Sequence, residues 1–314
     1  MNAPAIVAVA FGVALVATPV LARVARAIGV VDQPGPLKIH DAAVPYLGGV
    51  AVFVAVAGPL AAHRPALLVP MALALLLGLA DDVSGVAPRN RLAAEIMIGA
   101  VAGSIAPVPG SLGGIVTAAL VIGLINAVNL LDGLDGLAGG VALASAAGFA
   151  VIGGAARSPA LALAAALGGF LVYNRPPARI YLGDAGAYLI GTALALLAAL
   201  AITDPGGVGG WAAIPLLVAL PVFDTGVAIA RRVRARRPVF GGDRSHVYDQ
   251  LIDRGRTRVE TVLVLVAAQA VLAAGAAIVV QLDAIGAIAL GTLTAIALVA
   301  VATIGGFISP KKTS

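Results

Sequence analysis

The 314-residue sequence is 61% hydrophobic and 11% charged, with a mean hydropathy of +1.05. A soluble domain carries roughly a quarter charged residues. The composition therefore excludes a soluble protein and predicts an all-α, polytopic membrane protein built from apolar helices of about 20 residues. The absence of cysteine excludes disulfides and thiolate sites. The net charge of +5 lies in loops beside the expected spans, where it sets orientation and does not indicate nucleic-acid binding.

Glycines, prolines and charged clusters divide the chain into about eleven expected spans, with ten as the alternative count. Their expected ranges are 4–23, 46–62, 66–80, 92–106, 112–130, 137–155, 160–173, 185–203, 211–230, 261–280 and 284–308. We expect one membrane domain, 1–314, whose cytoplasmic loops lie near 24–45, 81–91, 129–136, 174–184 and 231–260.

The distribution of basic residues predicts the orientation of these spans. The first span has no Lys or Arg before it, and Arg23 and Arg26 follow it, which is the opposite of a secretory signal peptide. We expect the N-terminus outside and, with an odd number of spans, the C-terminus in the cytoplasm. With this threading 18 of the 20 Lys and Arg residues lie on the cytoplasmic side, as the positive-inside rule requires.

Carboxylates collect at the cytoplasmic ends of the expected helices. Asp81 and Asp82 follow an apolar run. Because neighbouring helical residues point about 100° apart, we expect one of them to bind a metal ion while the other contacts substrate. The alternative is a solvated pair that merely ends a helix.

The segment 129–136 is more specific. Asn129, Asp132 and Asp135 recur every three residues, a spacing that stacks them on one face of a helix end. Gly133 and Gly136 leave the backbone open to a ligand. The alternative is a calcium-like or plain polar turn, which does not need such regular spacing.

A third loop joins Asn174, Arg179, Tyr181 and Asp184. Arginine suits phosphate oxygens, tyrosine can stack on a base, and aspartate can bind a cation. A helix that starts near Gly186 would present backbone N–H groups to phosphate. The alternative assigns the arginines to membrane orientation and the tyrosine to the interfacial belt.

Two further loops carry weaker signals. Lys38 and His40 in the first loop are candidates for holding a diphosphate or a lipid phosphate. In the last loop Asp243, Arg244 and His246 form a polar turn.

An arginine run over 231–237 is expected to anchor the chain to anionic lipid. Asp224 falls within a span, where a carboxylate needs a partner. Arg231 is a candidate partner for Asp224.

Taken together and in order, these segments resemble the polyprenyl-phosphate N-acetylhexosamine-1-phosphate transferases of glycosyltransferase family 4, bacterial membrane enzymes that begin lipid-linked glycan assembly. The resemblance runs from Asp32 to about Gly255. It includes Asp32-x-Pro, Lys38-x-His40, Pro45-x-x-Gly-Gly49, Gly78-Leu-Ala-Asp-Asp82, Asn129-x-x-Asp-Gly-x-Asp-Gly136, Tyr173-Asn174, Tyr181-Leu-Gly-Asp184-x-Gly186, Pro221-x-x-Asp224 and Asp243-x-x-His246.

The resemblance implies the function of each block. Asp184 is implied as the principal Mg²⁺ ligand (Mn²⁺ as an alternative), with Asp81 and Asp82 beside the same ion and His246 in diphosphate handling. These four residues form the expected catalytic set. The expected substrate-binding set is Lys38, His40, Asn129, Asp132, Asp135, Asn174, Arg179, Tyr181, Asp243 and Arg244, in which Asn174 and Tyr181 hold the uracil.

Two departures from the family pattern stand out. The last loop reads His246-Val-Tyr248-Asp249 where His-x-His-His is common, and Leu37 stands where an arginine is common. Members that transfer MurNAc-pentapeptide phosphate carry a His-His-His run, so the chain is more similar to the GlcNAc-1-phosphate type.

The resemblance implies an enzyme in the cell membrane of a bacterium, with its active site facing the cytoplasm. It transfers GlcNAc-1-phosphate from a UDP-sugar to polyprenyl phosphate and releases UMP, and its expected partners include a second copy in a homodimer. An obligatory base is not expected, because a phosphate monoester has a second pKa near 6; Asp81 would serve if one were needed.

Three alternatives were weighed. The first is transfer of MurNAc-pentapeptide phosphate, and the second is a cation-coupled transporter. A transporter site lies near the bilayer midplane and opens to both sides, whereas these carboxylates crowd one face. The third, a structural membrane scaffold, leaves the repeated Asp-Gly units unexplained.

Overall fold

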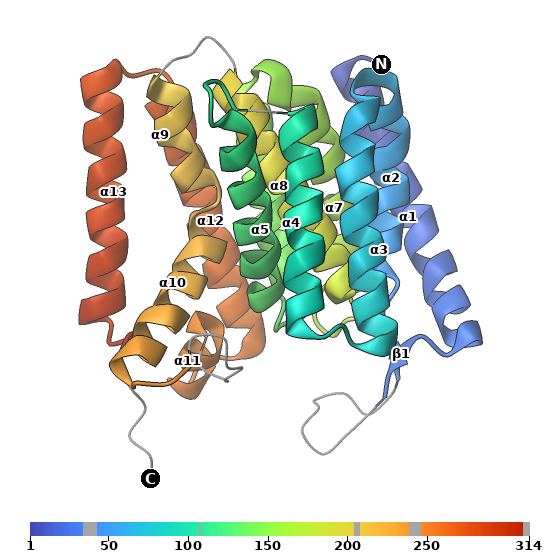
Figure 1. Ribbon diagram of the computed structural model, residues 1–314. Helices are drawn as coiled ribbons and strands as arrows, with labels where there is room; N and C mark the ends of the chain where they lie inside the picture. The colour runs from blue at the N-terminus through green and yellow to red at the C-terminus, as the bar shows by residue number, and fades with distance from the viewer. Residues whose placement is uncertain (34–42, 107, 204–207, 239–245, 310–314) are drawn as a thin grey trace.

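The computed structural model describes residues 1–33, 43–106, 108–203, 208–238 and 246–309 of the chain, whose helices stand side by side in one bundle (Figure 1). The long helices in chain order are α1 (Ala3–Ile28), α2 (Gly48–His63), α3 (Leu68–Ser84), α4 (Pro88–Ile105), α5 (Gly113–Leu131), α6 (Leu137–Ile152), α7 (Arg157–Asn174), α8 (Gly183–Thr203), α9 (Val208–Leu217), α10 (Ala219–Arg234), α12 (Arg258–Val279) and α13 (Ala284–Ile304). A short helix, α11 (Val247–Asp253), and two 3₁₀ turns, η1 (Pro65–Leu67) and η2 (Gly154–Ala156), complete the helical elements. Strands β1 (Val31–Asp32) and β2 (Val44–Pro45) pair antiparallel, with Val31 opposite Pro45.

The prediction of an all-α, polytopic membrane protein is confirmed. Within the described residues, 7 helices are long and apolar enough to cross a bilayer, or up to 8 if the bent pair α9 and α10 forms one span. The helices α2 and α6 are apolar but shorter, and α4 contains Arg89, Arg91 and Glu95. Each expected span coincides with a helix, with α9 and α10 together filling 211–230. The count of eleven crossings and the orientation stay predictions.

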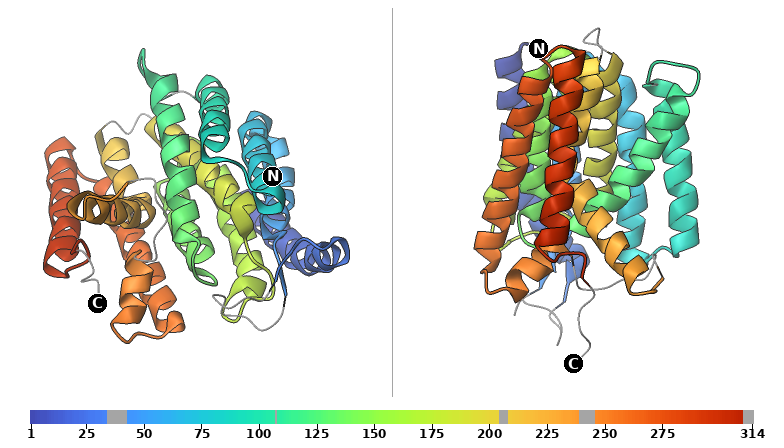
Figure 2. Two further views of the ribbon diagram at one scale, coloured as in Figure 1. Left: turned by 60° about the horizontal axis from the view of Figure 1, so that its bottom comes forward. Right: turned by 90° about the vertical axis from the view of Figure 1, so that its left-hand side faces the viewer.

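Helix α8 is the centre of the bundle. Its apolar window is 100% buried, whereas that of α13, at the edge of the bundle (Figure 2), is 6% buried. Helices α2, α3, α5 and α6 pack around α8. Close approach depends on small residues: a side chain at Gly78 of α3 or Gly49 of α2 would collide with the α8 backbone near Ala185 and Gly186. The N-terminal end of α8 is therefore enclosed by the ends of its neighbours.

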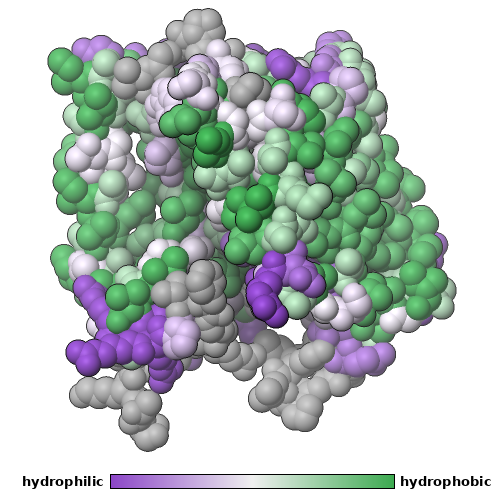
Figure 3. Space-filling view, viewed as in Figure 1, coloured by the Kyte–Doolittle hydropathy of each residue, from purple (hydrophilic) through white to green (hydrophobic). Residues whose placement is uncertain are grey.

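The surface matches this arrangement (Figure 3). Apolar side chains cover the length of the helices, while hydrophilic ones gather at the end where α10 and α11 lie. At the end of α10, Arg234 is exposed and is followed by exposed Arg236 and Arg237, whereas Arg231 and Arg232 are buried. This charge at one end of the bundle is what an interfacial basic segment requires.

The span formed by α9 and α10 is broken by a 64° bend. At the break, Gln269 of α12 accepts a hydrogen bond from the Leu220 N–H at 3.0 Å and donates to the carbonyls of Leu216 and Leu217, both at 3.0 Å. Backbone groups freed by a break in a membrane helix need such a partner. The buried amide of Gln269 therefore stabilises the bend that directs α10.

Replacing Gln269 tests this account of the bend. Gln269→Leu should lower the free energy of unfolding by about 1–3 kcal/mol, because it leaves buried backbone groups without partners. Thermal unfolding in detergent, followed by circular dichroism, measures the effect. The matched control is Gln281→Leu, at an exposed position; equal midpoints for the two variants would contradict the account.

Candidate active site

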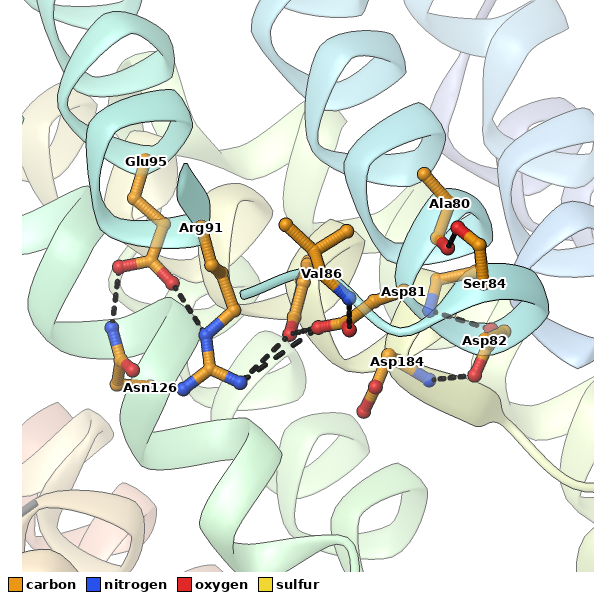
Figure 4. A network of polar contacts seen from close by, with 11 residues as sticks. Ala80, Asp81, Asp82, Ser84, Val86, Arg91, Glu95, Asn126 and Asp184 are labelled. Carbon is orange, nitrogen blue, oxygen red and sulfur yellow. Dashed lines mark hydrogen bonds and ion pairs between the residues drawn. The ribbon is translucent and has the colours of Figure 1, made fainter. Parts of the chain in front are cut away.

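The site is organised around the first residues of α8. Gly183 has a φ of +73°, a left-handed conformation that turns the chain into the helix. The carboxylate of Asp82, at the end of α3, accepts hydrogen bonds from the N–H groups of Asp184 at 2.9 Å and Ala185 at 3.1 Å (Figure 4). A negative charge at a helix N-terminus is stabilised by the helix dipole and by the backbone N–H groups of the first turn, which have no partner within the helix. Asp82 therefore caps α8 and fixes Asp184 in place.

Asp81 is held by several protein groups. Its Oδ1 accepts from the Val86 N–H at 2.7 Å, and its Oδ2 accepts from the Tyr188 hydroxyl at 2.5 Å. Arg91 lies 3.7 Å from the same Oδ2. Since both oxygens already have protein partners, the geometry does not favour Asp81 as a base. Its expected contribution to a metal site stays a prediction.

Asp132 and Asp184 differ from the other aspartates of the site. In the part of the chain that the structure describes, neither carboxylate has a hydrogen-bond donor from the protein. Burial, together with the negative charges of Asp184, Asp82 and Asp135, raises the pKa of Asp132 to about 8. Carboxylates from three loops thus share one electrostatic environment, and a cation would relieve their repulsion.

The number of carboxylates available in this cluster decides how it could bind Mg²⁺. Within the described residues, no group of three His, Asp or Glu side chains forms a ready cage for a metal ion. Mg²⁺ is commonly bound by one or two carboxylates together with substrate phosphates and water. The two unpartnered carboxylates, Asp132 and Asp184, fit that mode of binding.

The loops 129–136 and 174–181 are joined by side-chain hydrogen bonds. Asn174 is buried; its Oδ1 accepts from the Gly136 N–H at 3.0 Å, and its Nδ2 donates to the Ile180 carbonyl at 2.9 Å. Asp135 accepts from the Ala178 N–H at 2.9 Å. Asn174 and Asp135 therefore position the two loops, and their direct contact with substrate stays a prediction.

Two tyrosines form an aromatic wall beside the carboxylates. The ring centroids of Tyr46 and Tyr181 are 6.2 Å apart, with 51° between the planes. Burial raises the pKa of Tyr181 to about 12 and, together with a hydrogen bond to Asp32, moves the pKa of Tyr46 above its ordinary value. Both rings are neutral at physiological pH and present π-faces. The sequence analysis missed Tyr46, which the backbone pairing of Tyr181 with Pro45 brings here.

Of the remaining predicted site residues, the structure describes Arg179 and Asn129. Arg179 is exposed, and its carbonyl accepts from Arg26 at 3.5 Å. Asn129 begins the acidic loop, with its side chain partly exposed. The predictions for Lys38, His40, Asp243 and Arg244 fall outside the described residues.

His246 is part of a buried dyad. Its Nδ1 lies 2.6 Å from Oδ2 of Asp224, whose Oδ1 accepts from the Val247 N–H at 2.6 Å. Arg231 was the candidate partner of Asp224 in the sequence; in the structure α11 brings His246 onto this carboxylate. A carboxylate at Nδ1 fixes the orientation of the imidazole ring and directs Nε2 away from Asp224.

The two residues that replace the usual histidines have structural contacts. Asp249 accepts from the His246 N–H at 3.2 Å at the start of α11. The Tyr248 ring stacks on His246 with centroids 5.4 Å apart, and its hydroxyl donates to the Leu130 carbonyl at 3.4 Å. A side chain at Gly133 would collide with the Tyr248 phenol. Tyr248 therefore packs α11 against the acidic loop.

A polar network between α3, α4, α5 and α8 was also missed (Figure 4). It joins Asp81 to Tyr188 and Arg91, and Arg91 to Glu95, which accepts from Asn126. The signal in the sequence is a charge pair, Arg91 and Glu95, four residues apart at the start of an expected span. Ionisable residues in such a segment mark a functional site by default.

Comparison with known proteins decides the family. Residues 65–202 match the family model for glycosyl transferase family 4. A protein of Bacillus subtilis named probable undecaprenyl-phosphate N-acetylglucosaminyl 1-phosphate transferase is 31% identical over 277 residues, a match that covers 80% of this chain and 77% of the relative. The chain belongs to glycosyl transferase family 4. The resemblance seen in the sequence is confirmed.

Two other relatives show that the two kinds of named transferase match this chain over different lengths. Decaprenyl-phosphate N-acetylglucosaminephosphotransferase of Mycobacterium tuberculosis is 30% identical over 319 residues, covering 83% of this chain and 78% of that protein. Phospho-N-acetylmuramoyl-pentapeptide-transferase of Moorella thermoacetica is 36% identical over 160 residues, covering 41% of this chain and 50% of that protein. The similarity to the N-acetylglucosamine type extends over about twice as much of the chain.

The contact between Tyr248 and Gly133 can be tested by substitution. Gly133→Ala should lower the free energy of unfolding by about 1–3 kcal/mol, because the added methyl group collides with the phenol. Tyr248→Ala in the same chain should recover part of that loss by removing the ring. Thermal unfolding measures both variants.

Gly123→Ala is the control for this experiment, because nothing lies within 4 Å of its added methyl group. An effect of Gly133→Ala no larger than that of the control would show that Tyr248 does not pack there.

Proposed function

We propose that the protein transfers an N-acetylhexosamine-1-phosphate, GlcNAc-1-phosphate, from a UDP-sugar to polyprenyl phosphate and releases UMP. The observation that carries the proposal is the pair of carboxylates, Asp132 and Asp184, that interact electrostatically near the start of α8 and have no protein donors in the described part of the chain. The names of the B. subtilis and M. tuberculosis relatives support the same donor sugar and a polyprenyl phosphate acceptor.

Mg²⁺ is proposed as the resident ion, with Mn²⁺ as an alternative. Asp184 would hold it, with Asp132 and the expected ligands Asp82 and Asp81 close to the same charge. The bound ion would neutralise the negative charge of the diphosphate and of the leaving UMP. The support for this proposal is the environment that the carboxylates share, in which burial and then the charges of the neighbouring aspartates raise the pKa of Asp132.

The residues of the chain contribute mainly positioning, because phosphoryl transfer depends on alignment and charge neutralisation. The aromatic wall of Tyr46 and Tyr181 offers a flat surface to the uracil. The ring of His246, oriented by Asp224, offers Nε2 to a phosphate oxygen. The acceptor phosphate is largely a dianion at neutral pH, since its second pKa is near 6. The proposed reaction therefore needs no protein base.

We further propose that the protein acts in the cell membrane of a bacterium with this end of the bundle toward the cytoplasm. The basic last turn of α10 lies at the same end, which supports that orientation. The homodimer expected from the resemblance stays a prediction. A transporter is disfavoured because the carboxylates lie at helix ends rather than at mid-span.

The first experiment measures UMP release by the purified protein in detergent from UDP-GlcNAc and undecaprenyl phosphate. Release should require both Mg²⁺ and the lipid and should stop with EDTA. Asp184→Asn should lower the rate by about 10²–10³-fold, as loss of a major electrostatic contact does.

Asp283→Asn is the matched control, because this exposed aspartate caps α13 through the Gly286 N–H at 2.8 Å and asparagine caps equally well. Equal rates for the two variants would refute the proposed role of Asp184.

The donor sugar is tested by competition between substrates. The protein should release UMP from UDP-GlcNAc with a kcat/KM at least about tenfold above that for UDP-MurNAc-pentapeptide, a difference of roughly 1.4 kcal/mol in transition-state binding. The reverse preference would establish the MurNAc alternative. It would leave the class of reaction unchanged.

A further inference from the structure

Glu95 is a buried carboxylate whose position the proposed reaction does not yet explain. Its residue is 1% exposed, and its Oε2 accepts from Nδ2 of Asn126 at 2.7 Å. Its Oε1 is buried and accepts no hydrogen bond from the described residues. A buried charge with an unsatisfied oxygen is costly unless a counter-charge lies close by. That counter-charge is Arg91, whose Nε lies 3.6 Å from Oε1.

The other end of the Arg91 guanidinium faces the site. Its Nη1 lies 3.4 Å from the Tyr188 hydroxyl and 3.7 Å from Oδ2 of Asp81. The side chain is 31% exposed, and its Nη2 makes no hydrogen bond or ion pair with a described residue. A guanidinium has five N–H donors in a rigid plane. Glu95 and Asp81 thus hold it from two sides, while some donors remain open.

The charge of the Arg91 guanidinium also reaches the unpartnered carboxylate of Asp184. Tyr188 follows Asp184 by four residues on α8, so both side chains project from the same face of that helix. Arg91 is close enough to Asp184 for the two charges to interact. The guanidinium is therefore a fixed positive charge next to the place where the diphosphate is proposed to bind.

We propose that Glu95 is a positioning residue for the transfer reaction. Together with Asn126, it holds the Arg91 guanidinium in the orientation in which its open donors meet a phosphate oxygen of the substrate. This inference rests on the proposed function. It explains why a carboxylate is buried between α4 and α5, where an apolar side chain would pack at lower cost.

A double-mutant cycle on UMP release tests the inference. Glu95→Gln keeps the size of the side chain and removes its charge. Arg91→Lys keeps the positive charge and removes the planar guanidinium with its paired N–H donors. Each should lower kcat by about 10- to 100-fold, the cost of a misplaced catalytic contact. The double variant should be no slower than Arg91→Lys alone, because both substitutions disable the same guanidinium.

Stability and a matched control separate positioning from structure. Thermal unfolding of Glu95→Gln should not fall with kcat, since the substitution removes a buried charge. Arg89→Lys, on the same helix at an exposed position, should leave kcat unchanged. A loss of kcat that follows the loss of stability, or losses that add in the double variant, would overturn the inference.

A second variant serves if Glu95→Gln does not fold. The exchange Glu95→Gln with Asn126→Asp restores the hydrogen bond and the net charge, but it moves the carboxylate away from Arg91. This double variant should fold, and its kcat for UMP release should stay as low as that expected for Glu95→Gln; full activity would overturn the inference. Absence of UMP release by the unsubstituted protein would refute the proposed function itself, and the inference with it.

Discussion

The site depends on the cap that Asp82 places on α8. Its carboxylate accepts two N–H groups of the first turn and so fixes where the helix begins. Asp184 lies in that turn, and Tyr188 follows one turn later on the same face. A carboxylate at a helix N-terminus contributes about 0.3–1 kcal/mol when exposed and up to ~2 kcal/mol when partly buried. This contact sets the distance between α3 and α8, on which the positions of Asp81 and Arg91 also depend.

The acidic residues of the loops divide into two kinds. Asp82 and Asp135 accept hydrogen bonds from backbone N–H groups and therefore build the frame. Asp132 and Asp184 have no such partners among the described residues, so their oxygens are available to a ligand. The sequence motifs contain aspartates that accept backbone hydrogen bonds next to aspartates without donors, so the motif alone does not tell the two apart. A frame that holds two carboxylates without donors costs stability, and the proposed cation would offset that cost by binding the folded protein.

Much of the fold and the outline of the site follow from the sequence. Apolar runs predict the helices, and the Asp-Gly units predict which loops carry charge, because both signals are local. The pairing of Asp224 with His246 could not be predicted in this way, since it depends on how α11 returns onto α10. Tyr46 was missed for a similar reason: its position beside Tyr181 follows from backbone contacts between distant loops. Local patterns predict elements and candidate residues, while packing decides which residues meet.

The complete burial of α8 has a consequence for how the protein responds to its surroundings. The outer helices, and α13 most of all, are open to surrounding lipid, whereas the apolar window of α8 is fully buried within the bundle. When a bilayer thickens or thins, the outer helices tilt or shift to match it, at a cost of fractions of a kcal/mol per Å. The depth of Asp184 is set instead by the neighbours that enclose its helix. The chemistry at this end of the bundle is thereby insulated from changes in membrane composition.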